Sequence, residues 1–252
     1  MAIMKNDIPI LEYDADPLGV IMPDHEHINI SFPKKAVFAF LRDDVDRYAK
    51  EHNAVTAAHF ESATKEYPVY ILDVDGQQTC LVQAPVGAPA ATQIMDWLIA
   101  YGVREIISCG SCGVLVDIPE NAFLVPCKAL RDEGTSYHYL PPERFVDVSE
   151  KARHAIEKTM KNHGLPIWKL LRGQQTASSE KQKRKWRIGK VKVVRLLKWN
   201  ALRLRLVLRC VVQFGENSSL RLTLLQMRST TMNATGAMIP HLMRWNCVLR
   251  RS

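Results

Sequence analysis

Short apolar runs separated by polar turns fill the first two thirds of the chain. AVFAFL (36–41), REIISC (104–109) and AFLVP (122–126) have the length and composition of buried strands. VYILDVDGQQTCLVQA (69–84) predicts a hairpin, because the Asp75-Gly76 pair favours a tight turn between two strands. The pattern therefore predicts at least five strands before residue 130.

Three segments between these strands are helical in character, at 45–51, 90–102 and 148–164. Gly102 and Gly164 are predicted stops, and Ser149 is the predicted N-cap of the third helix. In the second helix four apolar residues recur at helical spacing: Ile94, Trp97, Leu98 and Tyr101. Strands alternating with helices predict an α/β fold with a largely parallel sheet covered on both faces.

Residues 1–35, rich in Pro, Asp and His, predict an irregular N-terminal arm. The chain starts without the basic and apolar regions of a signal peptide. It also lacks an apolar run of about 18 residues, so we expect no membrane span. Six cysteines are scattered through it: Cys80, Cys109, Cys112, Cys127, Cys210 and Cys247. This usage predicts a reduced, cytoplasmic protein.

Charge divides the chain into two unlike parts. Residues 1–169 hold 16 Lys and Arg against 24 Asp and Glu, whereas residues 170–252 hold 18 against two, Glu180 and Glu216. Such an asymmetry is typical of a basic arm that binds nucleic acid or a membrane surface. EKQKRKWRIGKVK (180–192), with its embedded tryptophan, resembles such an arm.

Two small-residue loops follow predicted strands, at residues 84–88 and 110–113. Ligands bind at the carboxyl ends of parallel strands, where such loops let the backbone come close. Their amides and the Ser111 hydroxyl could hold a phosphate or a sugar edge. Alternatively, Gly and Ala here only permit tight packing.

Cys109 and Cys112 have the spacing of a CxxC pair. A zinc or redox role needs a second pair or a histidine at suitable spacing, and the sequence has neither, so we predict no metal site. His25 and His27 in the arm are interpreted as solvated or capping residues rather than ligands.

Residues 104–143 resemble the nucleoside phosphorylase and nucleosidase family, of the uridine and purine phosphorylase type. The stretch REIISCGSCGVLVDIPENAFLVPCKALRDEGTSYHYLPPE is similar to the family's strand, its G-[ST]-x-G loop, the next strand and its R-x-[DE]-G-[TA]-S-x-H-[YF] segment. Residues 42–47 resemble its G-D-P-D-R phosphate loop, with Asp43 in place of the glycine. Lys65-Glu66-Tyr67 resembles R-E-F, whose basic residue reaches the phosphate of a neighbouring subunit.

The resemblance implies a three-layer αβα fold with a mixed, largely parallel sheet, here spanning residues 36–169. It implies phosphate-binding roles for four residues, Arg47, Lys65, Gly110 and Ser111. Cys112 and Gly113 would lie on the ribose and base side of the same loop. It also implies a nucleoside substrate, inorganic phosphate as co-substrate without an organic cofactor, and a homo-oligomer that is dimer-based and up to a hexamer. Nucleic acid and membranes are not expected partners.

One position departs from the phosphorylases. Where they carry an arginine on the strand before the G-[ST]-x-G loop, this chain has Ser108. A guanidinium binds phosphate bidentately and a hydroxyl does not. Hydrolytic nucleosidases of this fold also lack that arginine, so a nucleosidase that uses water is the alternative.

The family's base-binding segment, ribose-binding Met-Glu and catalytic aspartate do not appear after Lys169. Yet LLKWNALRL (196–204), read one nucleotide out of step, can encode E-M-E-C-A-A-L. The Lys198–Trp199 junction gives ATG or GTG, and the Trp199–Asn200 junction can give only GAA, a glutamate codon. The ribose motif of the family can therefore be recovered from this stretch.

The same frame yields family-like sequence elsewhere in the tail. Residues 169–180 permit V-V-T-W-T-T-D-G-F-F-R, and residues 215–227 permit G-E-L-L-F-T-A-D-S-L-A-D. Acidic codons are forced at three further junctions: Met232–Asn233, Met238–Ile239 and Trp245–Asn246. We therefore predict a frameshift close to Lys169, which accounts for the missing acids.

Several expectations follow for the tail, residues 170–252. They should be irregular, and LRLRLVLRCVV (202–212) would be an out-of-frame reading of what should be a helix. No catalytic residue is then in frame, so the chain as written should be inactive. If instead residues 181–205 form a genuine nucleic-acid-binding segment, affinity should fall steeply with salt.

Overall fold

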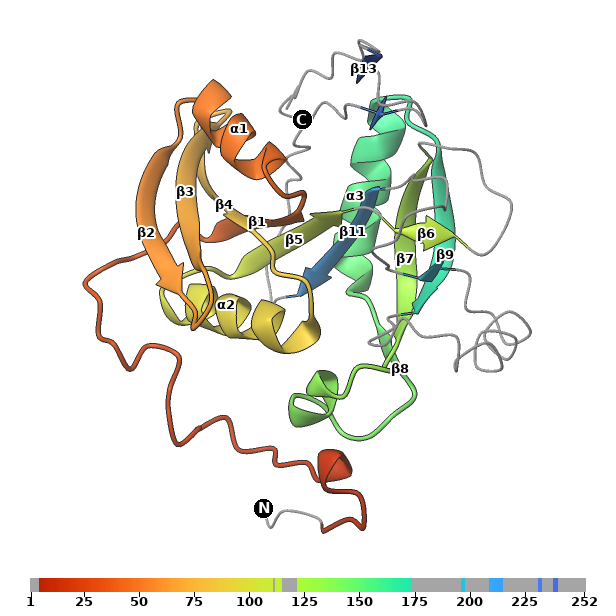
Figure 1. Ribbon diagram of the computed structural model, residues 1–252. Coiled ribbons are helices and arrows are strands. Elements are labelled where there is room, and N and C mark those ends of the chain that lie inside the picture. Colours follow the sequence, from red (N-terminus) through yellow and green to blue (C-terminus); the bar gives the residue numbers. More distant parts are fainter. Residues whose placement is uncertain are drawn as a thin grey trace.

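The computed structural model describes residues 5–110, 112–114 and 122–173, together with four short strands at 196–197, 209–214, 231–232 and 238–239. Within these residues a large mixed sheet is flanked by helices on both faces (Figure 1). Its strands run in the order β2-β3-β4-β1-β5-β11-β7-β9-β10-β6, and β8 pairs with β7. The sheet is mixed, as predicted.

The first half of the sheet comes from the segments whose apolar runs predicted strands. It contains β1 (Lys35–Phe40), β2 (Val55–Glu61), β3 (Glu66–Val74), β4 (Gln77–Gln83) and β5 (Glu105–Gly110). β1 lies between β4 and β5 and is parallel to both, whereas β2 and β3 extend the edge as an antiparallel pair. The β3–β4 turn has positive φ at Asp75 and Gly76, which confirms the predicted hairpin.

The second half of the sheet contains β7 (Phe123–Leu130), β8 (Phe145–Asp147), β9 (Ile167–Gly173) and the short β6 (Gly113–Val114) and β10 (Leu196–Leu197). β11 (Arg209–Phe214) joins the halves, because it is antiparallel to β5 and parallel to β7. β7 therefore runs opposite to β5 (Figure 1). A separate pair is formed by β12 (Thr231–Met232) and β13 (Met238–Ile239).

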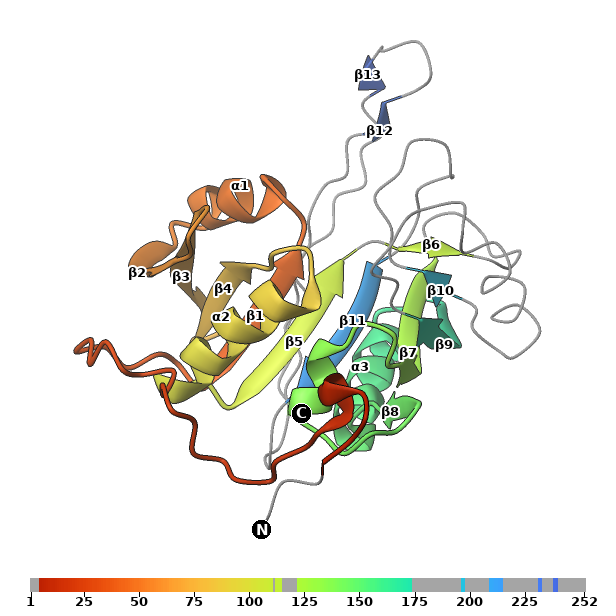
Figure 2. The same ribbon diagram turned by 60° about the horizontal axis from the view of Figure 1, so that its bottom comes forward.

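Three helices cover the sheet, and alternation along β1 decides which face each one covers. Ala36 and Phe38 point into the cluster that contains α2 (Ala88–Ala100), including Trp97 and Leu98. Val37 and Ala39 point to the other face, against α1 (Asp44–Glu51). α3 (Glu150–Asn162) packs on β7 through Ile156 and Met160, together with Ile107 of β5. The result is the expected three-layer αβα arrangement (Figures 1 and 2).

The predicted helix ends are confirmed. The Ser149 hydroxyl accepts a hydrogen bond from the backbone N–H of Ala152 at 3.4 Å, as an N-cap does. Gly102 and Gly164 both have positive φ, of 122° and 66°, just after the helices they end.

The N-terminal arm is irregular except for a single 3-10 turn, η1 (Pro9–Leu11). It is fixed at both ends. Phe32 is buried and packs against Trp97, with ring centroids 5.1 Å apart. η1 lies against a second 3-10 turn, η2 (Thr135–His138), as Figure 2 shows.

Two predictions about the C-terminal third need correction. β9 runs through Lys169 to Gly173 in register with β7, so regular structure continues past the predicted boundary. Residues 209–214 form a strand, not the irregular or poorly packed structure expected for residues 170–252. The physical reason is that RCVVQF has high strand propensity and that β5 and β7 each offer it a row of backbone partners. Most of residues 170–252 lie outside the described residues.

No helix in the described part of the chain is long and apolar enough to cross a membrane.

Candidate functional site

β1, β4 and β5 are parallel and end at one edge of the sheet. Phe40 is paired with Gly110, and Ala39 with Gln83. The backbone N–H of Ala84 then donates to the carbonyl of Ala39 at 2.8 Å, which holds the loop at 84–88 beside the end of β1. This loop, the end of β5 at Gly110 and the segment that begins α1 therefore lie where ligands bind in α/β sheets.

The close packing of Phe40 requires a glycine at position 110. A Cβ at this position would lie 2.9 Å from the Cβ of Phe40, closer than real Cβ contacts. The glycine here therefore serves close packing as well as any ligand role, so the two interpretations of the loop are compatible. Cys112 is 3% exposed, and Gly113 pairs with Leu197 in the sheet. Ser111 lies outside the described residues.

Arg47 lies in α1, directly after the end of β1. Its guanidinium donates to the carboxylate of Asp44, three residues earlier on the helix, and its side chain is 45% exposed. The neighbouring Asp46 accepts a hydrogen bond from the Tyr70 hydroxyl at 3.0 Å. Burial and this carboxylate raise the pKa of Tyr70 to about 12, so it remains a donor. Phosphate would have to compete with Asp44 for Arg47.

Lys65 lies in the turn between β2 and β3, at the same edge of the sheet. Its ammonium group is 3.4 Å from the side-chain oxygen of Gln83 and 5.2 Å from the centroid of the Tyr67 ring. β3 and β5 are separated by β4 and β1, so Lys65 is roughly 14 Å from the Gly110 loop across the sheet. A single chain therefore does not bring Lys65 beside Gly110.

Ser108 is on β5, 8% exposed, and pairs with Phe38. By alternation it points to the same face as Ile106, which belongs to the cluster around α2. The position that an arginine would occupy in a phosphorylase is thus a buried, small polar residue at the rim of the core.

The segment around Arg131, which carries much of the family resemblance, lies far from this edge. Through Cys210 of β11, Gly110 is level with Leu124 near the start of β7. Arg131 is seven residues further along, roughly 23 Å away, at the opposite edge. Gly110 and Arg131 therefore lie at different levels of the sheet, whereas Gly113, at the other end of the candidate loop, is linked to Leu130 through Leu197 and Gly173.

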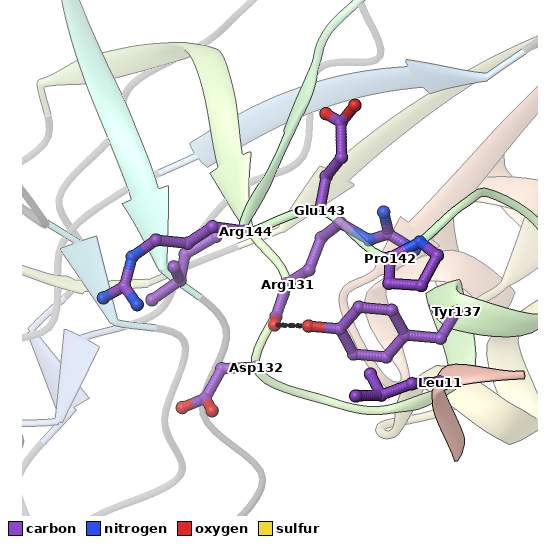
Figure 3. Close-up of a pocket in the computed structure, with 8 residues that line it drawn as sticks. Leu11, Arg131, Asp132, Tyr137, Pro142, Glu143 and Arg144 are labelled. Carbon is purple, nitrogen blue, oxygen red and sulfur yellow. Dashed lines mark hydrogen bonds between the residues drawn. The ribbon is translucent and has the colours of Figure 1, made fainter. Parts of the chain in front are cut away.

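Arg131 has a structural role. It is 5% exposed, and its guanidinium donates four hydrogen bonds. The acceptors are the Ser136 hydroxyl and the carbonyls of Ser136, Leu140 and Pro141, at 2.6 to 2.9 Å. It also stacks on the Tyr137 ring at 4.4 Å, and the Tyr137 hydroxyl donates back to the Arg131 carbonyl (Figure 3). Arg131 folds the loop of η2 around itself.

A pocket of about 490 Å³ opens beside this loop (Figure 3). Its lining combines Leu11 of the arm with residues at the end of β7 and after η2: Leu130, Arg131, Asp132, Tyr137, Pro142, Glu143 and Arg144. The Tyr139 hydroxyl donates to Asp96 of α2 at 2.5 Å and ties the same loop to the helix. Burial raises the pKa of the Asp96 carboxyl. This pocket is not at the edge where β1 and β5 end.

Cys80 and Cys127 carry free thiols. Burial raises the pKa of Cys80 to about 12, so its thiol is not a nucleophile. Within the described ranges, no group of three or more His, Cys, Asp or Glu side chains is arranged to hold a metal ion.

Residues 34–180 match the family model described as the phosphorylase superfamily. The chain belongs to this superfamily. A uridine phosphorylase of Haemophilus influenzae is 24% identical over 142 residues, which are 55% of this chain and 56% of that protein. The chain thus spans about half the length of this curated relative.

Solved structures of the phosphorylase superfamily share the fold. A uridine phosphorylase of Vibrio fischeri superposes with a TM-score of 0.60 at 19% identity, covering 72% of this chain and 80% of that one. A purine nucleoside phosphorylase of Toxoplasma gondii gives 0.55 at 15%, covering 72% and 76%. The MTAN of Helicobacter pylori gives 0.53 at 13%, covering 71% and 86%. At these identities the comparison establishes the fold.

Arg42, the first residue of the stretch that resembles the phosphate loop, has a φ of 52°. The sequence did not indicate this left-handed backbone, because glycine, asparagine or aspartate normally occupies that region of φ.

Proposed function

We propose that this chain carries the phosphate end of a nucleoside phosphorylase, which cleaves the N-glycosidic bond of a purine or pyrimidine nucleoside to base and ribose 1-phosphate. The observation that carries the proposal is the common end of β1, β4 and β5, with Phe40 packed on Gly110. Such an edge, with backbone amides and a nearby guanidinium, suits an anion placed beneath a sugar. Membership of the superfamily supports it.

The chemistry divides between two sides of the site. On one side, Arg47, Gly110 and Ser111 would hold phosphate so that its oxygen attacks the sugar carbon as the bond to the base breaks. Cys112 and Gly113 would face the ribose and base. Lys65 would serve the phosphate of a neighbouring subunit in a homo-oligomer, since it is roughly 14 Å from the loop of its own chain. On the other side, a carboxyl group must assist the leaving base as it gains a proton.

The carboxyl group that assists the leaving base would come from the C-terminal third. Whether the chain encodes it depends on the reading frame. The family match ends at residue 180, which leaves the basic remainder of the chain outside it. A frameshift close to Lys169, and with it an inactive chain as written, is our proposal for this remainder. Sequencing the DNA around the Lys169 codon tests it. Intact DNA in the present frame, confirmed from an independent source, would refute the frameshift.

Hydrolysis is the second candidate, and two observations favour it. Ser108 stands where phosphorylases carry an arginine, and the Arg47 guanidinium is already bound to Asp44. The serine at position 108 and the pairing of Arg47 with Asp44 both lower the affinity of the site for phosphate, whereas hydrolysis by water needs no cationic site. Phosphorolysis remains our proposal because Arg47 lies in a sequence that resembles the phosphate loop and at the edge where that loop belongs.

The decisive experiment uses the enzyme with its frame restored after Lys169. Cleavage of inosine and uridine is followed with and without inorganic phosphate, and the sugar product is identified. Phosphate-dependent release of ribose 1-phosphate is the expected result. Equal rates in both conditions, with free ribose as product, would identify a hydrolase. No cleavage of either nucleoside under any condition would contradict both candidates.

The basic tail offers a candidate of another class. Titrating the chain as written with single- and double-stranded nucleic acid over a range of salt concentrations tests it, since binding through residues 181–205 requires a steep loss of affinity with salt. We expect no such binding.

A further inference from the structure

The N-terminal arm is attached to the rest of the protein at two places. At the inner one, Phe32 is buried against Trp97, and its backbone N–H donates to the carbonyl of Tyr101 at 2.7 Å. The Tyr101 hydroxyl also accepts from the backbone N–H of Ile28 at 3.2 Å. The inner attachment therefore combines a buried aromatic ring with hydrogen bonds to α2, and both kinds of contact stabilise it.

The outer attachment, η1, is different in kind. Its backbone hydrogen bonds stay within the arm, because Leu11 donates to the carbonyl of Ile8 at 2.9 Å and Glu12 to the carbonyl of Pro9 at 3.1 Å. None of the residues of η1 is buried. Among the described residues, nothing from 5 to 22 makes a hydrogen bond or ion pair with a residue outside the arm. Side-chain packing alone therefore holds η1 in place.

This packing is shallow. Ile10 lies over Gly134, where a Cβ would be 3.8 Å from the Cδ1 of Ile10, and the Ile10 side chain is still 39% exposed. Leu11 lines the pocket together with Tyr137 (Figure 3). Segments that bury little apolar surface and lack hydrogen bonds to their surroundings open at a low cost in free energy.

The linker between the two attachments, residues 12–23, does not resist such opening. Its backbone donors are satisfied locally, since the Asp14 carboxylate accepts from the N–H of Asp16 at 3.0 Å and the Asp16 carboxylate from the N–H of Leu18 at 2.9 Å. The side chains of Leu18 and Val20 are exposed. The linker can therefore move with η1 without losing a contact to the core.

The surface under η1 is held independently of the arm. Arg131 donates four hydrogen bonds to the loop of η2, and Tyr139 of that loop donates to Asp96 of α2. None of these bonds involves a residue of the arm. The loop should keep its shape when η1 leaves, so that only the wall formed by Leu11 is lost from the pocket.

We infer that residues 5–12 form a strap that opens and closes the pocket beside Arg131, with its hinge in the linker before Ile28. In the closed form, shown in Figures 2 and 3, Leu11 is one wall of the pocket. In the open form, Leu130 and Tyr137 lose that cover. The strap is independent of the proposed function, because it uses no residue of the phosphate edge.

Distances between two spin labels on the full chain, measured by pulsed electron paramagnetic resonance, test the inference. One pair is placed at positions 8 and 143, which are both exposed, and a second pair at 28 and 143 reports on the inner attachment. Non-canonical amino acids carry the labels, so the cysteines stay unlabelled. Ile10→Asp puts a charge against Gly134. Leu18→Asp is the matched control, because it makes the same kind of change in the exposed linker.

We expect the 8–143 pair of the parent to show a narrow short distance and a minor, broad, longer one. Ile10→Asp should raise the ratio of long to short distances by about 10-fold, because a carboxylate is unfavourable in an apolar contact. Leu18→Asp should leave this ratio unchanged, and the 28–143 distance should stay the same in every variant.

Three results would overturn the inference. Identical 8–143 distributions in the parent and Ile10→Asp would show that η1 is fixed. A broad long distance alone in the parent would show that η1 has no place on the loop of η2. A 28–143 distance that lengthens together with the 8–143 distance would show that the whole arm detaches, with no hinge before Ile28.

Discussion

Gly110 and Phe40 face each other at the ends of the two central parallel strands, so closely that a Cβ on Gly110 would lie 2.9 Å from the Cβ of Phe40. The contact holds the end of β5 against the end of β1. Packing of the strand ends and the proposed phosphate site therefore depend on the same glycine.

Gly110→Ala should separate these strand ends. We expect destabilisation of about 1–3 kcal/mol, the usual effect of an added methyl group in a packed site, and a loss of phosphate affinity because the loop shifts. Urea unfolding and calorimetry measure the two effects. Adding Phe40→Gly to Gly110→Ala removes the Cβ that the methyl group would meet and should recover part of the phosphate affinity. If Gly110→Ala alone changed neither quantity, the close contact would be refuted.

Arg131→Met should destabilise the protein strongly without a specific effect on phosphate binding. It removes a buried guanidinium and leaves the carbonyls of Ser136, Leu140 and Pro141 without their donor. Ser136 is partly buried and Leu140 and Pro141 are exposed, so the loss comes mainly from the hydrogen bonds of the buried guanidinium. A hydrogen bond to a charged group contributes about 1.5–3 kcal/mol, so a loss of roughly 3 kcal/mol or more is expected in urea unfolding. Arg144→Met, on the exposed side of the same pocket, should change stability by less than about 0.5 kcal/mol. Similar effects of the two variants would contradict the structural role of Arg131.

Local signals predicted local structure well. The Asp75-Gly76 turn, the Ser149 cap and the glycine stops at 102 and 164 each depend on a few neighbouring residues, and the structure confirms them. β2 was missed because its residues have no clean alternation and depend on pairing with β3. β9 was missed because its pairing with β7 is long-range.

The candidate site was predictable only in part. The common end of β1, β4 and β5 follows from their parallel pairing, and the structure has it. The position of the Arg131 segment relative to Gly110 depends on β11, which lies between β5 and β7 and is about 100 residues further along the chain. No spacing within residues 104–143 carries that information.

The pH dependence of stability should include a contribution from Glu157 on α3. Glu157 accepts from Lys169 of β9 at 2.8 Å and from Arg153 at 2.6 Å. Burial alone would raise the pKa of this carboxyl, but together the hydrogen bonds and charges of Lys169 and Arg153 hold it below its ordinary value.

A carboxyl group with a depressed pKa in the folded state stabilises the protein above its unfolded pKa, here near 4.5. This stabilisation is lost as pH falls through 4.5 toward the lower pKa of the folded state. Glu157→Gln should therefore be less stable than the parent at neutral pH and should show a smaller loss of stability on acidification. Thermal unfolding from pH 7 down to pH 3 measures it, with Glu143→Gln, an exposed residue, as control. Parallel pH profiles for parent and Glu157→Gln would refute the prediction.

Asp44→Asn should release Arg47 for phosphate. Asp44 binds the Arg47 guanidinium and also adds a negative charge next to the loop at 110–113, so both effects oppose an anion there. The pair is largely exposed, and exposed pairs contribute at most about 1 kcal/mol to stability. We therefore expect phosphate affinity to rise by about 2-fold to 5-fold at low salt, with little change in melting temperature. The gain should shrink as salt screens the charges. Asp73→Asn, which removes a carboxylate from the turn between β3 and β4 at the other end of these strands, should leave phosphate affinity unchanged. If Asp44→Asn weakened phosphate binding instead, Asp44 would be acting to hold Arg47 in its binding position rather than to compete for it.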